Sequence, residues 1–258
     1  PSQNDALHYK LYENAITVLK NEKEILPIKN LDQKIAYVKL GEDVNSTFVT
    51  TLKKYTEVTE IANTDIDSLN QELKNYDTVI IGFHKANKTW EKQNFTDTEL
   101  LWLQEIAKHN KVILAIFSKP YSLLPIANFD AIEGLVVSYQ NSNISQIVSA
   151  ELLFGGIGAK GKLPVSINNN FTVNDGLSTE KLNRLAFSTP ENVDMNPAIL
   201  SKIDVIAQKA IDGKMAPGMQ VLVARKGSVI FHKSYGYQTY DNVKKVTNSD
   251  LYDVASIS

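Results

Sequence analysis

The most constraining feature of the sequence is an alternation of apolar runs and amphipathic segments that continues from residue 5 to about residue 167. The apolar runs are continuous and rich in β-branched residues, and stretches with helical spacing lie between them. Strands that are apolar on both faces, separated by helices, are typical of a parallel sheet covered on both sides. The pattern therefore predicts an α/β fold, a flavodoxin-like three-layer sandwich with a mainly parallel sheet.

The expected strands of this sandwich are Lys34–Leu40, Glu57–Ala62, Thr78–Phe83, Lys111–Phe117, Ile132–Val137 and Lys162–Ile167. Helices are expected at Asp43–Tyr55, after a capping box of Thr64 and Asp67, after Thr96 with Glu99, and at Asn143–Phe154. A capping box marks a helix start because its two side chains satisfy backbone N–H groups that the first turn leaves unpaired.

The pattern changes near residue 168, which predicts a domain over residues 1–170, a linker over 171–195 and a second segment over 196–258. The second segment begins with an N-cap at Asn196 and an apolar helical stripe that ends at Gly213. Two strands joined at Lys226 and Gly227 follow as a hairpin. A helix and a hairpin bury little core, so we expect a partial α+β segment, the opening of a second domain in an excised piece of a longer protein.

Composition excludes several classes of function. With 27 Lys plus Arg against 29 Asp plus Glu, the chain offers no general attraction to nucleic acid or anionic lipid. It contains no cysteine, and its four histidines have no metal-ligand spacing, so no metal and no cofactor are expected. No run reaches the ~20 apolar residues of a membrane span, and the first residues do not resemble a signal peptide.

A glycine run matches the dinucleotide-binding fingerprint in its letters, with Gly156, Gly158 and Gly161 in the required positions. Nucleotide binding needs a strand before the glycines and a helix after them, so that helix N–H groups face the phosphate. Here the expected order is reversed. The run is therefore interpreted as a helix end and a turn.

The loop from His84 to Asp97 follows the strongest expected strand, at the edge where α/β sheets bind ligands. A sugar-binding interpretation rests on His84, Lys85, Trp90 and Glu91, because tryptophan stacks on sugar rings and charged groups bond hydroxyls. A solvated loop with one hydrophobic anchor explains the same residues. Both readings remain open from the sequence.

Three stretches of the first domain resemble the C-terminal domain of glycoside hydrolase family 3. They are Asn14–Glu22 with Ile25–Ile28, Lys34–Leu40, and Glu151–Gly155 with Gly161–Val165. The resemblance covers about residues 5 to 170. Asn196–Ser258 resembles the start of a serine β-lactamase or penicillin-binding-protein-like domain, through Pro217–Ala224 and Tyr252–Ser258. That likeness makes Ser256 the expected nucleophile, with its lysine one residue beyond Ser258.

These resemblances carry functional expectations. Family 3 enzymes hold their nucleophilic aspartate in an N-terminal (β/α)8 barrel, which is the implied partner, and they act on carbohydrate. Glucosidase members add an acid/base glutamate near a Ser-Glu-Gly motif, which Trp90–Phe95 lacks. In acetylglucosaminidases the acid/base lies on the barrel. The resemblance thus favours a catalytically silent domain of a periplasmic, secreted or envelope-associated β-N-acetylhexosaminidase.

Three alternatives stay open at this point. In the first alternative, the parent protein is a β-glucosidase-type enzyme. The second places a serine hydrolase activity at Ser256, which needs a neighbouring general base and an oxyanion hole. The third is a flavodoxin-like ligand-binding module, which a phosphate or flavin bound after a strand end would support.

Overall fold

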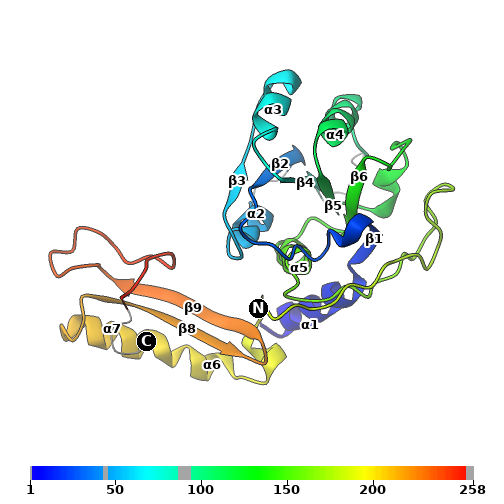
Figure 1. Cartoon of the computed structure of the whole chain (residues 1–258). Helices are drawn as coiled ribbons and strands as arrows, with labels where there is room; N and C mark the ends of the chain where they lie inside the picture. Colours follow the sequence, from blue (N-terminus) through cyan, green and yellow to red (C-terminus); the bar gives the residue numbers. More distant parts are fainter. Residues whose placement is uncertain (1, 43–45, 87–93, 254–258) are drawn as a thin grey trace. The chain divides into compact units, whose positions relative to one another are not determined.

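The computed structural model describes residues 2–42, 46–86 and 94–253 and divides into two compact units (Figure 1). The sandwich unit comprises Leu7–Arg184. The hairpin unit comprises Pro1–Ala6 together with Leu185–Ser258. The division falls inside the range 171–195, which the sequence suggested as a linker, and residues 171–184 belong to the sandwich unit.

The described part of the sandwich unit is built on a six-stranded sheet with the strand order β1-β6-β5-β4-β2-β3. The strands are β1 Thr17–Asn21, β2 Ile35–Gly41, β3 Val58–Glu60, β4 Thr78–His84, β5 Val112–Phe117 and β6 Ile132–Val137. Strands β2 to β6 are parallel, and β1 pairs antiparallel with β6. Without β1, this is the order of flavodoxin-like sheets. The predicted fold class, a mainly parallel α/β sandwich, is confirmed.

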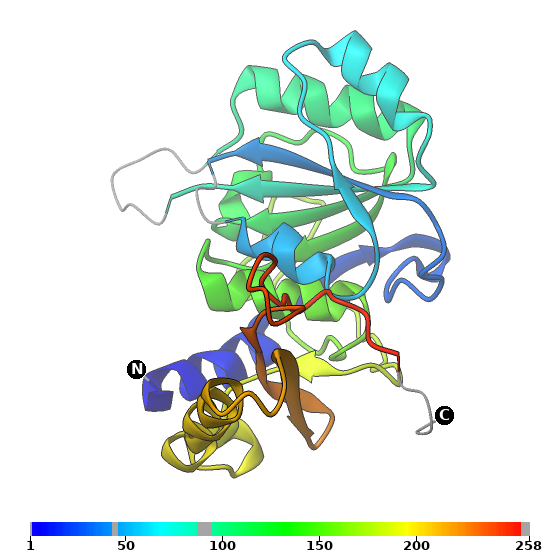
Figure 2. The ribbon, with the colours of Figure 1, turned by 90° about the vertical axis from the view of Figure 1, so that its left-hand side faces the viewer.

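Helices cover both faces of the sheet (Figure 2). On one face α3 Ile66–Leu73 and α4 Asp97–His109 pack over a core that includes Ile81 and Leu114. On the other face α2 Thr47–Leu52 and α5 Asn143–Leu153 pack over a core that includes Ile80 and Ile113. Neighbouring strand residues enter opposite cores because side chains alternate across a sheet, which is why these strands are apolar throughout.

Capping side chains fix the starts of these helices. The predicted box at α4 is present, with Thr96 Oγ1 accepting from Glu99 N and Glu99 accepting from Thr96 N. At α3 the predicted box is wrong by one residue. Asp65, which has extended backbone angles, caps the helix by accepting from Ser68 N at 2.8 Å. Aspartate is at least as good an N-cap as threonine, so the helix starts one residue later than expected.

Two other predicted elements differ in the structure. The helix expected over Asp43–Tyr55 is only α2, preceded by Ser46 with a φ of 52°, and residues 43–45 lie outside the described part. The strand expected over Lys162–Ile167 is not part of the sheet. Leu163 and Ile167 are buried in alternation with exposed neighbours, as in a strand, but Leu163 N bonds to Asp175 O. Burial alternates along this segment as it does in a strand, but the segment forms no hydrogen bonds with the described strands of the six-stranded sheet.

Helix α1 (Ser2–Ala15) precedes the sheet, and two 3-10 turns, η1 (Glu22–Glu24) and η2 (Pro120–Leu123), lie in its connections. No helix of the described residues is both long and apolar enough to cross a membrane.

The hairpin unit has a small core. Its sheet has the order β7-β9-β8, with β7 Ala186–Phe187, β8 Gly218–Arg225 and β9 Ser228–Gly236. Its helical segments are η3 Pro190–Val193, α6 Pro197–Leu200 and α7 Lys202–Asp212. The predicted hairpin turn is present, with positive φ at Lys226 and Gly227, and Asn196 caps α6 as expected. Buried apolar residues of this unit form a cluster of Val193, Leu200 and Ile230.

Candidate functional site

The carboxyl edge of the parallel sheet is the first place to look for a ligand, since the order in which successive strands are added to the sheet reverses between β2 and β4. In this structure the two strand ends meet closely: Gly41 pairs with His84, and Glu42 N donates to His84 O at 2.7 Å. Gly41 has a φ of 80°, and a Cβ at that position would lie 2.0 Å from His84 O. Only glycine fits this approach, which places the backbone at the end of β2 directly against that of β4.

The side chain of His84 lies in a network of buried polar and aromatic side chains at this edge. It is fully buried, with Nε2 2.9 Å from the Tyr37 hydroxyl and Nδ1 3.0 Å from Asn141 Oδ1. The imidazole also stacks on the Phe117 ring, with centroids 4.5 Å apart. Asn141 Oδ1 accepts a second bond from Gln146 Nε2 at 2.6 Å. The network therefore joins β2, β4, β5 and α5 at one point.

This network constrains the tautomer of the neutral ring. Asn141 Oδ1 can only accept, so His84 Nδ1 donates to it, and in a neutral ring Nε2 then accepts from the Tyr37 hydroxyl. Gln146 Oε1 in turn accepts from Phe48 N at 2.8 Å, which ties α2 into the same cluster. A ligand could contact His84 only by replacing one of these buried bonds. The geometry makes His84 a positioning residue of the edge.

Lys85, the next residue, also bonds to another side chain of the protein. Its side chain is 10 % exposed, and Nζ lies 3.1 and 3.2 Å from the two carboxylate oxygens of Glu99. Nζ is also 5.1 Å from the centre of the Phe83 ring. Glu99 belongs to the capping box of α4, so this ion pair attaches the end of β4 to the start of α4.

Two side-chain contacts join the residues before and after positions 87–93 of the predicted loop. Phe83 stacks on Phe95 with ring centroids 3.6 Å apart, and Lys85 pairs with Glu99. Both flanks of residues 87–93 are thereby held together. Trp90 and Glu91, the other two residues of the sugar-binding hypothesis, lie outside the described residues, and so does Ser256. Within the described part of the chain, no cluster of three or more His, Cys, Asp or Glu side chains could hold a metal ion.

The glycine run packs against neighbouring backbone. Gly155, with a φ of 72°, ends α5, and Gly156 N donates back to Glu151 O at 2.8 Å. A Cβ on Gly158 would lie 2.5 Å from Thr179 O, and one on Gly161 would lie 2.3 Å from Ala15 O. These glycines allow close chain crossings and present no row of N–H groups at a helix start.

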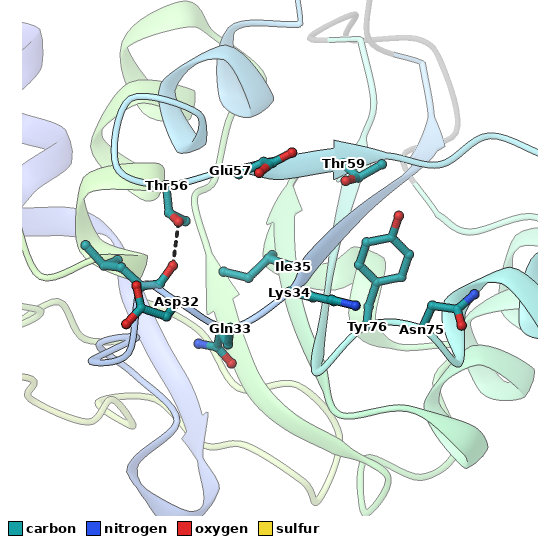
Figure 3. Close-up of a pocket in the computed structure, with 10 residues that line it drawn as sticks. Asp32, Gln33, Lys34, Ile35, Thr56, Glu57, Thr59, Asn75 and Tyr76 are labelled. Carbon is teal, nitrogen blue, oxygen red and sulfur yellow. Dashed lines mark hydrogen bonds between the residues drawn. The ribbon is translucent and has the colours of Figure 1, made fainter.

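The amino edge of the sheet holds a cavity that nothing in the sequence pattern indicates. It has a volume of about 510 Å³ and lies at the beginnings of β2 and β3 and beside Tyr76 (Figure 3). Its polar residues come from three separate connections and form no motif, so no local signal in the sequence indicates it. Only the folded arrangement brings them together.

Comparisons with known proteins agree with the sandwich fold. A family model described as the glycosyl hydrolase family 3 C-terminal domain matches residues 16–215. No curated protein sequence matches the chain. Among solved structures, a fungal multi-domain family 3 β-N-acetylglucosaminidase with a GCN5-related glucosamine N-acetyltransferase region is similar, at 21 % identity and a TM-score of 0.53.

That alignment covers 92 % of this chain and 28 % of the fungal one. A β-glucosidase from Listeria innocua, in complex with isofagomine, has 17 % identity and a TM-score of 0.51, over 62 % of this chain and 26 % of its own. A family 3 β-N-acetylglucosaminidase from Paenibacillus sp. str. FPU-7 has 17 % identity and a TM-score of 0.51, over 62 % and 32 %. The chain thus spans between about a quarter and a third of these proteins.

Proposed function

The chain belongs to glycosyl hydrolase family 3, whose C-terminal domain it carries, and from this premise we propose that it is a non-catalytic partner of an N-terminal (β/α)8 barrel. In this proposal the barrel holds the groups that cleave the glycosidic bond of a carbohydrate. The sandwich unit helps to close the barrel's sugar site and presents residues of its carboxyl edge there.

The observation that carries the proposal is the pairing of Lys85 with Glu99, together with the stacking of Phe83 on Phe95. These contacts fix both flanks of residues 87–93 to the sheet and to α4. A retaining glycosidase needs two carboxyl groups about 5–5.5 Å apart, one of them free to exchange a proton with the leaving group. Glu99 is held by Lys85 Nζ and by Thr96 N, which suits it to support rather than to proton transfer.

Within this role, Trp90 and Glu91 are the residues proposed to meet sugar, from a segment whose ends are fixed. His84 and Lys85, which the sequence also offered as sugar ligands, are proposed to act through position. We propose a β-N-acetylhexosaminidase as the parent enzyme, because the loop lacks the Ser-Glu-Gly motif of glucosidases. A β-glucosidase is the alternative. A periplasmic, secreted or envelope location accompanies this proposal.

The test is hydrolysis of aryl β-N-acetylglucosaminide and aryl β-glucoside by the purified chain. The proposal expects no turnover above that of a Glu91→Gln variant, because the chain alone lacks the barrel groups. Turnover that survives purification to homogeneity and disappears in Glu91→Gln would contradict it. Such a result would assign acid/base catalysis to this domain, as in the glucosidase arrangement.

A second function is proposed for the hairpin unit, as the start of a serine β-lactamase-like domain. The order of α7 followed by the antiparallel β8 and β9 supports it, and so do exposed apolar side chains such as Ile206 at 67 % and Met215 at 81 %. Ser256 is then the nucleophile, activated by a lysine three residues later. Intact-mass spectrometry with a fluorescent penicillin should detect no adduct on this chain. An adduct at Ser256 would show that another base activates it.

A further inference from the structure

The cavity at the amino edge of the sheet has the size of a small-molecule site. Its volume of about 510 Å³ lies within the ~300–1,000 Å³ of typical ligand pockets. Figure 3 shows Glu57 and Thr59 on one wall, Asn75 and Tyr76 on the opposite side, and Lys34 and Ile35 between them. The cavity belongs entirely to the sandwich unit, at the end of the strands away from His84.

The base of this cavity is rigid. Ile35 is 1 % exposed, and the backbone N–H of Lys34 donates to Asp77 Oδ2 at 2.8 Å. Gln33 Oε1 accepts from the Thr78 hydroxyl at 2.9 Å, so its amide is held by the start of β4. On the wall that carries Glu57, the Thr56 hydroxyl donates to Leu31 O at 2.6 Å, the bond drawn in Figure 3. A pocket that is preformed in this way loses little entropy when a ligand binds.

The groups that face the cavity have unused bonding capacity. Among the described residues, the Lys34 ammonium, the Glu57 carboxylate and the Tyr76 hydroxyl have no hydrogen-bond partner. They supply a donor, an acceptor and a group that does both. The Tyr76 ring, partly buried against the core, adds an apolar surface beside them. This combination of an aromatic face with mixed donors and acceptors matches a sugar ring, which has apolar C–H faces and hydroxyls around its rim.

Charge at the cavity argues against an anionic ligand. Two carboxylates, Asp32 and Glu57, line it against the single ammonium of Lys34. Helix α3 ends at Leu73, just before Asn75 and Tyr76, so its negative dipole end is also on this side. A phosphate or carboxylate ligand would meet net repulsion here. A neutral polyhydroxylated ligand would not.

We propose that this cavity is a second carbohydrate-binding site, which holds a neutral oligosaccharide on the amino edge of the sheet. Tyr76 provides the stacking surface and one hydroxyl, Glu57 accepts hydrogen bonds from sugar hydroxyls, and Lys34 donates to them. The site performs no chemistry and does not depend on the role proposed for the carboxyl edge. It would retain the protein on a glycan while hydrolysis, if the parent performs it, takes place elsewhere.

The test is a titration of the ¹⁵N-labelled chain with N,N′-diacetylchitobiose and with cellobiose, followed by amide chemical shifts. At least one of the two sugars should shift the amides of residues 31–35, 56–59 and 75–76. The Tyr76→Phe variant, which loses a hydroxyl, and the Glu57→Gln variant, which loses the charge that strengthens its hydrogen bonds, should each bind about fivefold to tenfold more weakly. Tyr121→Phe and Glu180→Gln, which change exposed residues of the same unit, should bind like the unchanged chain.

Three outcomes would overturn the proposal. One is the absence of shifts at these amides with both sugars at about 20 mM, well above a dissociation constant of about 1 mM. Another is equal binding by the Tyr76→Phe and Glu57→Gln variants. The third is a stronger response of the same amides to inorganic phosphate or to glycerol. A hydrolysis assay is independent of all three, so failure of this site and failure of the proposed function are distinguishable.

Discussion

At the carboxyl edge of the sheet, His84 and Lys85 bond to other side chains of the protein, whereas at the amino edge Lys34 and Glu57 face an open cavity. Flavodoxin-like sheets are expected to bind ligands at the first of these edges. Here the described part of that edge is filled by a histidine network and an ion pair. The topological position of a site therefore does not by itself make it accessible.

The two edges also differ in how a substitution should act. A side chain at the carboxyl edge participates in several buried contacts, so its loss should lower the free energy of unfolding. A side chain at the amino edge is exposed, so its loss should affect binding and leave stability nearly unchanged. Both tryptophans, Trp90 and Trp102, belong to the sandwich unit, so tryptophan fluorescence during urea unfolding reports on that unit alone.

The largest effect is expected for Phe117→Ala. Phe117 is fully buried, stacks on His84 and packs edge-on against Phe48 at 4.8 Å. Removing the ring leaves a cavity and should lower the free energy of unfolding by about 3–5 kcal/mol. Urea denaturation followed by fluorescence measures this change. Tyr121→Ala, at an exposed tyrosine, serves as the control and should change it by less than about 0.5 kcal/mol.

A somewhat smaller loss, about 2–4 kcal/mol, is expected for His84→Ala. The substitution removes the imidazole that bonds the Tyr37 hydroxyl and Asn141 Oδ1, and with it the ring stacked on Phe117. The matched control is His109→Ala at an exposed histidine, with little expected change. If both histidine variants unfold at the same urea concentration, the network does not hold the edge together.

The ion pair at the end of β4 is expected to contribute less. Lys85→Met keeps the aliphatic stem over Phe83 but leaves the Glu99 carboxylate, 16 % exposed, without its cation. Because the pair is neither fully buried nor freely exposed, we expect a loss of about 1–2 kcal/mol. The double variant Lys85→Met with Glu99→Gln should recover part of this loss, since the unpaired charge is then gone. Equal stability of the single and the double variant would contradict this explanation.

The smallest effect on stability is expected at the amino edge. Glu57→Gln changes an exposed side chain with no described partner and should alter the free energy of unfolding by less than about 0.5 kcal/mol. The same urea titration measures it. A large loss of stability would mean that Glu57 supports the fold, and the contrast between the two edges would then disappear.

The sequence predicted the sheet well because its strands are buried on both faces. Thr78–His84 and Val112–Phe117 are continuous apolar runs with no competing pattern, so only their ends were uncertain. Lys162–Ile167 was mistaken for a strand because burial alternates along it while its hydrogen bonds go to residues 171–175. A local pattern reports burial and does not report which chain supplies the hydrogen bonds.

The candidate sites were harder to predict for a related reason. The sequence placed His84 and Lys85 correctly at a strand end, but their partners Asn141 and Glu99 lie 57 and 14 residues away. Without those partners, a histidine and a lysine after a strand look available to a ligand. The amino-edge cavity gave no signal at all, because Lys34, Glu57 and Tyr76 meet only after the chain has folded.

We infer that His84 positions the carboxyl edge and is not itself a sugar ligand. The most direct test is the ¹⁵N NMR spectrum of its ring nitrogens, recorded with and without N-acetylglucosamine. In the neutral ring we expect the proton on Nδ1, bonded to Asn141, and no change of the ring signals when the sugar is added. A proton on Nε2, or ring signals that move on addition of the sugar, would contradict this inference.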